Sequence, residues 1–186
     1  MSHLTDKAIK AAFMKLLEEQ PFEKITVKDI VEECGINRNT FYYHFQDIYA
    51  LLQEILDEET EKSLKSSQEY LTWQDGILQA ISFALENKKA LYHIYNSVNR
   101  VRIEKYLHSV VGKIMKEYAI RQAAGIRVSE EDISMVAAFY QCALVGMLLG
   151  WLDDGMKADP EEIVHRLGIM LEGNMKNMLK KAGGQD

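Results

Sequence analysis

The 186-residue chain lacks the signature of β-structure, because apolar and polar residues nowhere alternate for more than four positions. Apolar residues recur instead three and four positions apart, which is the period of an amphipathic helix. The sequence therefore predicts an all-α protein of about nine helices.

Cysteine is scarce, and Cys34 and Cys142 lie far apart within apolar helical patterns. Neither stands at a metal-ligand spacing, so we expect two buried, reduced thiols, no metal site and no cofactor. The first residues also lack the charged and apolar regions of a signal peptide. A cytoplasmic location is the expectation that follows.

Positive charge is scarce as well. The net charge is −6, and residues 1–50 hold six Lys/Arg against eight Asp/Glu. This balance excludes a histone-like protein that binds nucleic acid without specificity. Catalytic signatures are missing too: the histidines His93, His108 and His165 do not form H-E-x-x-H, and there is no nucleophile motif or phosphate-binding glycine loop. No enzymatic activity is predicted.

The most informative segment that is present runs from Thr26 to Leu52, TVKDIVEECGINRNTFYYHFQDIYALL. Thr26 opens a short helix with a T-x-x-D capping box, and Gly35 can end it in a left-handed turn. A second short helix follows, anchored by Phe41 and Phe45 at i and i+4, in a stretch without acidic residues. This is the profile of a helix-turn-helix whose second helix packs on one side and is polar on the other, so DNA binding is the first hypothesis.

Residues 40–45, TFYYHF, match the T-[LF]-Y-x-H-F pattern of the TetR (tetracycline repressor) family, which the first 55 residues or so resemble. Activator-type members associated with dihydroxyacetone kinase operons carry a similar segment. The resemblance implies a helix-turn-helix domain over residues 1–46, a connecting helix over 47–69, and a ligand-binding and dimerisation domain over 70–186.

The resemblance also implies which residues contact DNA. Arg38, Asn39 and Tyr43 would face base edges. Thr40, Tyr42 and His44 would mainly hold phosphates, and Thr26 would anchor the start of the helix that it opens. Lys28, one turn into the helix that begins after Thr26, is placed to reach a base or a phosphate. The expected partner is double-stranded DNA with a palindromic operator, which a twofold dimer reads at half-sites about 34 Å apart.

Several alternatives stay open for this segment. Asn37 suits an N-cap better than a base contact, Arg38 could pair with Glu32 or Glu33, and Tyr42 and His44 could be structural. Ile48 stands where family members commonly carry a lysine that contacts phosphate. A regulator with this fold that acts through a protein partner, binding DNA weakly or not at all, is therefore the alternative function.

Capping signals place the remaining helices. A first helix is expected over Thr5–Glu19, a fourth from Asp47, and a fifth from the T-x-x-D at Thr72. Further helices are expected at 90–95, at 98–124, from Ser129 to about Trp151, and from Pro160 to the glycine pair at 183–184.

Residues 133–152 form a twenty-residue run without charge. A membrane span has this length, but polar residues interrupt the run, its flanks are acidic, and no second span exists. We expect instead that the helix is buried between its own core and a twofold partner, with no membrane involved. The predicted homodimer interface consists of Gly146, Gly150, Ile163, Leu167 and Met170.

A small-molecule effector that binds the C-terminal domain is a further implication of the resemblance. The candidate pocket residues are Trp73, Phe83, Tyr92, His93, Tyr95, Tyr140, Met147 and Trp151. For each of these, plain core packing is the alternative.

Overall fold

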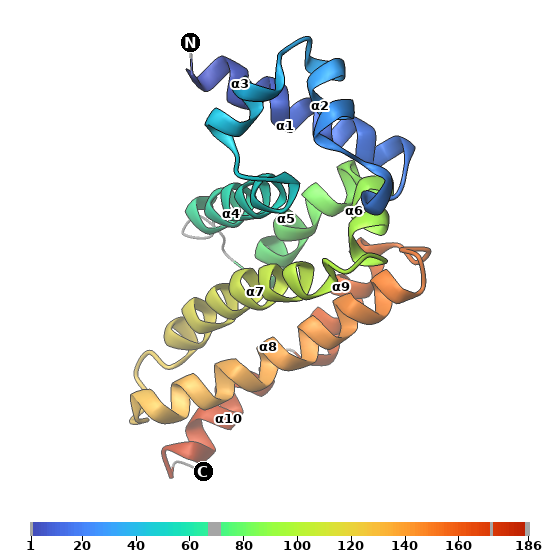
Figure 1. Ribbon diagram of the computed structural model, residues 1–186. Coiled ribbons are helices and arrows are strands. Elements are labelled where there is room, and N and C mark those ends of the chain that lie inside the picture. The colour runs from blue at the N-terminus through green and yellow to red at the C-terminus, as the bar shows by residue number, and fades with distance from the viewer. Residues whose placement is uncertain (1, 67–71, 172, 185–186) are drawn as a thin grey trace. The chain divides into compact units, whose positions relative to one another are not determined.

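The structure is a computed structural model, which describes residues 2–66, 72–171 and 173–184. Over these residues it contains ten α-helices, one 3-10 turn and no strand, which confirms the all-α class (Figure 1). The helices are α1 (Ser2–Glu19), α2 (Val27–Cys34), α3 (Arg38–His44), α4 (Ile48–Ser66), α5 (Trp73–Glu86), α6 (Lys88–Tyr95), α7 (Arg100–Gln122), α8 (Glu130–Asp153), α9 (Pro160–Leu171) and α10 (Asn174–Ala182), and the 3-10 turn is η1 (Phe22–Lys24).

The chain forms two compact units. The first combines Met1–Glu59 with Phe83–Ile103, and the second combines Thr60–Ser82 with Glu104–Asp186. This division differs from the domain boundaries at residues 46 and 70, which remain a prediction. The predicted end of the connecting helix, residues 67–69, lies outside the described residues.

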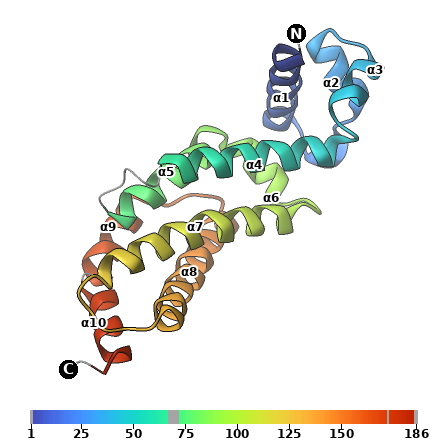
Figure 2. The ribbon, with the colours of Figure 1, turned by 90° about the vertical axis from the view of Figure 1, so that its left-hand side faces the viewer.

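The first unit has a core of aromatic and aliphatic side chains around α1, α2 and α3, which lie together in both views (Figures 1 and 2). Phe13, Phe22, Ile30 and Phe41 are almost completely buried, and the rings of Phe13 and Phe22 meet edge to face at 6.1 Å. Apolar burial of this kind is the main force that assembles such a small helical unit.

Helix α6 packs against α1 in the same unit, although 68 residues separate their nearest ends. The Ala90 backbone N–H donates to Glu18 Oε1 at 3.1 Å, and His93 Nδ1 lies 2.7 Å from the carbonyl oxygen of Leu17. Glu18 serves this helix N-terminus in place of Asn87, whose side chain makes no capping hydrogen bond. The first unit therefore includes a helix that the sequence places far from it.

The second unit is built on α7 and α8, which run side by side (Figure 1). Gln141 Nε2 donates to the His108 carbonyl at 2.9 Å, and a Cβ at Gly112 would lie 2.8 Å from that nitrogen. The missing side chain at Gly112 thus makes room for the contact. On α10, Met175 and Leu179 are buried, and this helix packs against α8.

The capping predictions are confirmed. The side chains of Thr26, Asn37, Asp47, Thr72 and Ser129 each accept a hydrogen bond from the backbone N–H three residues later. Pro160 is the first residue of α9, as expected from its fixed φ.

Three sequence expectations were wrong. The first helix begins at Ser2 instead of Thr5. The last helix is two helices, because Gly173 adopts a left-handed conformation (φ 71°) between α9 and α10. The two cysteines are not both buried: Cys34 is half-buried, and burial raises the pKa of its thiol, but Cys142 is exposed on α8.

Candidate nucleic-acid interface

A capping box holds the start of α2. The Thr26 hydroxyl accepts from the Asp29 N–H at 3.3 Å, while Asp29 Oδ2 accepts from the Thr26 backbone N–H at 2.8 Å and from its hydroxyl at 2.7 Å. These hydrogen bonds favour the carboxylate and lower the pKa of Asp29. Thr26 itself is exposed, at the surface where a phosphate contact is predicted.

The turn between α2 and α3 depends on Gly35. Its φ is +68°, in the left-handed region, and a Cβ there would meet no atom within 4 Å. The requirement for glycine is therefore one of backbone conformation and not of space. The N–H of Ile36 then donates to the Val31 carbonyl at 3.0 Å and closes the turn.

Helix α3 is anchored on its inner side. Phe41 is fully buried and Phe45 nearly so, and their ring centroids lie 5.9 Å apart. Asn37 caps the helix by accepting from the N–H of Thr40 at 2.9 Å and from its hydroxyl at 3.2 Å. The seven-residue helix is thus held by two aromatic anchors and a cap, which leaves its other side free.

The outer side of α3 is solvent-exposed and polar. Arg38, Asn39, Tyr42 and Tyr43 are all exposed, and Tyr43 has 83% of its surface accessible. Arg38, Asn39 and Tyr43 make no hydrogen bond or ion pair with the part of the chain that the structure describes. Three polar groups of one short helix are therefore available to an external partner.

The acidic residues that could have captured Arg38 are paired elsewhere. Lys15 Nζ lies 2.6 Å from Glu33 Oε1, and Lys28 Nζ lies 3.7 Å from Glu32 Oε1. The Lys28 pair is exposed at both ends, so it is worth little and can open on contact with a phosphate.

The two predicted phosphate contacts at Thr40 and His44 are half-buried. The His44 ring lies between those of Tyr43 and Phe45, at centroid distances of 5.4 and 6.2 Å. One edge of His44 thus packs against its neighbours while part of the ring reaches solvent. This position is compatible with a phosphate contact and with a structural role.

A charged cluster behind α3 was not found from the sequence. Lys10 of α1 is buried, and its Nζ donates to Asp6 at 2.8 Å and to Glu54 and Glu58 of α4 at 2.7 and 2.9 Å. Burial opposes the charge on Lys10, but the three hydrogen bonds outweigh it and raise the pKa of the ammonium. The only signal in the sequence is a pair of i, i+4 spacings, which are common on exposed helices.

The predicted effector residues fall into both units. Phe83, Tyr92, His93 and Tyr95 belong to the first unit, where the Tyr95 ring lies 4.5 Å from the Arg100 guanidinium. Those of the second unit are Trp73, Tyr140, Met147 and Trp151. The eight residues are therefore divided between the two units, and their shared role in effector binding stays a prediction.

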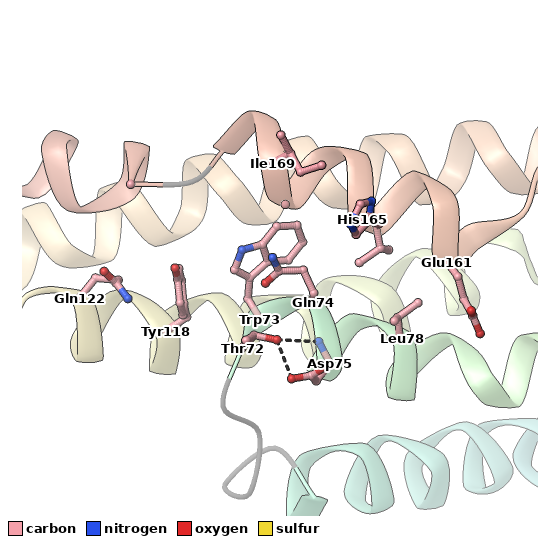
Figure 3. A pocket seen from close by; sticks show the side chains of 13 residues that line it. Thr72, Trp73, Gln74, Asp75, Leu78, Tyr118, Gln122, Glu161, His165 and Ile169 are labelled. Atoms are coloured by element: carbon pink, nitrogen blue, oxygen red, sulfur yellow. Dashed lines mark hydrogen bonds between the residues drawn. The ribbon is translucent and has the colours of Figure 1, made fainter.

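Within the second unit these residues have different environments. Trp151 donates its indole N–H to the Ala158 carbonyl at 2.9 Å, and burial, with a smaller effect of Tyr118, raises the pKa of Tyr140. Trp73 lines a cavity of about 590 Å³ between α5, α7 and α9 (Figure 3).

The predicted interface residues lie on an exposed apolar face of α8 and α9. Gly146 and Gly150 are exposed, and a Cβ at either would meet nothing within 4 Å. Met170 is 70% exposed and, together with Ile163, Leu167 and Met147, borders a groove of about 400 Å³. This face extends along α8 through Phe139, which is 60% exposed.

Helix α8 also has the length and apolar composition of a membrane span, although 28% of its most apolar window is buried within the chain. One helix of this kind is weak evidence for a membrane protein, because core helices of soluble proteins pass the same test.

By fold and exposed recognition surface, the molecule falls in the class of helix-turn-helix transcriptional regulators. Two family models agree: "Bacterial regulatory proteins, tetR family" matches residues 9–55, and "Transcriptional regulator C-terminal region" matches residues 71–173. Since the second covers more than half of the chain, the protein belongs to the TetR family. Members of this family are regulators and not enzymes, in agreement with the prediction from the sequence that the protein has no enzymatic activity.

Two curated relatives have similar sequences. The HTH-type dhaKLM operon transcriptional activator DhaS of Lactococcus lactis subsp. lactis (strain IL1403) is 31% identical over 87 residues, 47% of this chain and 46% of the relative. The uncharacterized HTH-type transcriptional regulator YxbF of Bacillus subtilis (strain 168) is 28% identical over 173 residues, 87% of this chain and 43% of the relative. The matches span less than half the length of either relative.

Solved structures share the fold over nearly the whole chain. The dihydroxyacetone kinase operon activator DhaS has a TM-score of 0.77 at 21% identity, covering 93% of this chain and 97% of that one. A TetR transcriptional regulator from Streptococcus agalactiae 2603V has a TM-score of 0.62 at 22% identity, covering 92% and 95%. The predicted similarity to operon activators of this type is confirmed at the level of sequence and fold.

Proposed function

We propose that this protein is a cytoplasmic homodimer that binds a palindromic double-stranded operator through α3 and controls transcription in response to a small molecule. The observation that carries the proposal is the outer side of α3, where Arg38, Asn39 and Tyr43 are exposed and unpaired within the described chain. A helix presented in this way can enter the major groove, where amide and guanidinium groups distinguish base pairs.

Individual roles follow from chemistry. Arg38 can donate two hydrogen bonds to guanine, Asn39 can pair with adenine, and Tyr43 can contact a base edge or methyl group. Thr40, Tyr42 and His44 mainly hold backbone phosphates, Thr26 anchors the start of α2, and Lys28 reaches a base or a phosphate. We propose residues 1–46 as the DNA-binding domain and residues 70–186 as the domain for dimerisation and effector binding.

The proposed dimer rests on the exposed face of α8 and α9. Phe139 and Met170 are large apolar side chains that a single chain leaves in water, and Gly146 and Gly150 allow another helix to approach closely. Because the chain belongs to a family of DNA-binding regulators, we propose a second copy, and not lipid, as the partner that covers this face.

The test is binding of the purified protein to a fluorescent DNA fragment from upstream of its own gene, measured by anisotropy at several salt concentrations. We expect tight binding by the wild type and a loss of at least tenfold for Tyr43→Ala, because each base contact is worth about 1–3 kcal/mol. Ile120→Ala is the control, since Ile120 is an exposed side chain outside the helix-turn-helix and outside the proposed sites.

A fold check accompanies these variants. Tyr43 is so exposed that Tyr43→Ala should leave thermal unfolding unchanged. If the wild type bound no fragment at low salt without a second protein, direct DNA reading would be refuted and the partner-dependent regulator favoured.

A further inference from the structure

The cavity between α5, α7 and α9 lies entirely within the second unit (Figure 3). Its walls come from the first turns of α5, the last turns of α7 and one face of α9, and its volume is about 590 Å³. A space of this size accommodates a small metabolite.

Trp73 brings an unsatisfied donor to this cavity. Its side chain is only 7% exposed, and its indole N–H has no acceptor among the residues that the structure describes. Trp151, equally buried, donates to a carbonyl as buried tryptophans usually do. A buried donor without a partner costs about 1–3 kcal/mol, so Trp73 offers a binding position to an acceptor atom of a ligand.

Two amide side chains line the same space. Gln74 lies against α9 at Gly168, where a Cβ would be 2.5 Å from Gln74 Nε2, so glycine at 168 makes room for this amide. Gln74 and Gln122 are both half-buried, and neither makes a hydrogen bond within the described ranges. Each can both donate to a ligand and accept from it.

The charges around the cavity restrict the ligand. Among the described residues, its lining includes the carboxylates of Asp75 and Glu161 and the imidazole of His165, but no lysine or arginine. An anion would be repelled by the carboxylates. A simple cation would leave the Trp73 donor unpaired, whereas an uncharged molecule with several hydroxyl groups satisfies donors and acceptors alike.

We propose that this cavity is the effector site and that it takes an uncharged, polyhydroxylated small molecule. Trp73, Gln74 and Gln122 supply its hydrogen bonds, the carboxylates of Asp75 and Glu161 accept hydrogen bonds from its hydroxyl groups, and Leu78, Val164 and Ile169 cover its C–H surface. This inference rests on the regulatory function proposed above and specifies its ligand.

Helix α9 connects this site to the proposed dimer interface. Glu161, His165 and Gly168 line the cavity at i, i+4 and i+7, while Ile163, Leu167 and Met170 border the apolar groove. At 100° per residue these two sets lie on opposite sides of α9. A ligand that changes the position of α9 therefore changes the association of the two copies, through its different affinity for the two arrangements.

The test is a calorimetric titration of the full chain, without DNA, using polyhydroxylated probes that differ in charge. Glycerol, ribitol, sorbitol and glucose are the neutral probes, gluconate the anionic one and glucosamine the cationic one. We expect saturable binding of at least one neutral probe, none of gluconate, and weaker binding of glucosamine. The emission of Trp73 in a Trp151→Phe background, which leaves one tryptophan, should change with the same midpoint.

Two variants locate the site. Gln122→Ala should weaken probe binding about tenfold, the equivalent of about 1.4 kcal/mol, and Gly168→Leu should abolish it by displacing Gln74 into the cavity. Gln79→Ala, an exposed glutamine of α5 outside the cavity, is the matched control. If Gly168→Leu did not fold, Gln122→Ala would decide alone.

Saturation by gluconate, tighter binding of glucosamine than of every neutral probe, no response to any neutral probe, or unchanged binding in Gln122→Ala would overturn this inference. Operator binding that persists without any probe response would refute the effector site alone. Probe binding without operator binding would refute only the proposed function.

Discussion

The exposure of Arg38, Asn39 and Tyr43 is the residue-scale basis of the proposed DNA binding. None of them contributes to the core, and each carries hydrogen-bonding groups that find no partner in the described chain. Their neighbours Phe41 and Phe45 do the opposite and bury their rings. Residues 38–45 therefore combine buried anchors on one side with exposed polar groups on the other, which is the pattern of a helix that contacts an external partner.

Arg38→Ala distinguishes a base contact from a phosphate contact. If Arg38 reads guanine, the variant should bind the operator about tenfold or more weakly and lose preference at one base pair, with little change in salt slope. A phosphate contact would instead weaken binding to all sequences and reduce the salt slope by about 1. Anisotropy titrations at several salt concentrations separate the two, with the exposed Arg121→Ala as control.

Lys10 is expected to stabilise the first unit. Lys10→Met leaves three carboxylates facing one another without their ammonium. Because Glu54 and Glu58 remain about half exposed, we expect a loss of about 1–3 kcal/mol, less than for a fully buried pair. Urea unfolding measures this loss.

Lys7→Met, an exposed lysine on the same helix, is the control and should change little. The raised pKa of Lys10 means that its contribution is fully present below the ordinary lysine pKa of about 10.4 and disappears only as pH rises through the folded value. Equal stability of Lys10→Met and wild type at pH 7 would contradict this account.

At the scale of elements, hydrogen bonds and turns at the ends of the short helices stabilise them. Helix α2 has eight residues and α3 has seven, too few to be stable alone in water. Both have a polar N-cap, and a left-handed glycine ends α2. Caps and buried anchors together hold helices that propensity alone would not.

Thr26→Ala tests the cap of α2 and should destabilise the first unit by about 1 kcal/mol. The folded pKa of Asp29 is lowered chiefly by its hydrogen bonds with Thr26, so that contribution is present above the unfolded value of about 3.9 and is lost as pH falls through the folded pKa. The stability difference between wild type and Thr26→Ala should therefore shrink in acid.

Chemical unfolding at pH 7 and at pH 3 measures this change. Thr26→Ser keeps the hydroxyl and should restore stability at both pH values. Asn37→Ala removes the cap of α3, which involves no carboxylate, and should not share the pH dependence of the Asp29 pair. A difference that grew in acid would contradict the assigned role of Asp29.

At the scale of the whole molecule, α8 is the element on which the proposed homodimer rests. Its inner face is buried, with Val136, Tyr140, Leu144 and Trp151 among the core residues. Its outer face carries Phe139 and two glycines whose Cβ positions are open space. A single chain gains nothing from glycine at an exposed helix position, where it costs about 1 kcal/mol relative to alanine.

Gly146→Leu tests whether Gly146 lies on a free surface of a single chain or in a close-packed dimer interface. In an isolated chain the substitution improves helix propensity and its Cβ meets no atom within 4 Å, so it should raise stability. At a close-packed dimer seam it should instead convert the dimer to monomer and weaken operator binding. Sedimentation equilibrium and anisotropy report these outcomes, and Ile120→Glu, at an exposed position of α7, is the control for a surface change.

Much of the local structure was predictable because it depends on neighbours in sequence. The capping residues, the Gly35 turn and the anchors of α3 all act over three to five positions, so their patterns can be read directly. The break at Gly173 was missed because apolar spacing continues past it, and one left-handed glycine is enough to divide the helix.

The remaining features depend on contacts between distant segments. The Lys10 cluster joins α1 to α4, α6 docks on α1, and the cavity at Trp73 needs three helices. None of these has a period or motif in the sequence. Trp73 was a candidate for the effector site, but the half-buried Gln74 and Gln122 and the exposed His165 were not. In the sequence, such polar residues cannot be distinguished from other surface residues until their neighbours are known.

The amino-acid sequence by itself determined the helical class, the family, the helix-turn-helix and the residues that face outward from α3. The helices could be read in this way because helix periodicity and capping are local properties of the chain. The family followed from the resemblance of residues 40–45 to a known pattern. Only the tertiary structure decided which buried donors lack a partner, which charges meet behind the recognition helix, and which apolar face remains uncovered. Those depend on the packing of residues far apart in sequence, where one added methyl group or one missing acceptor changes the outcome.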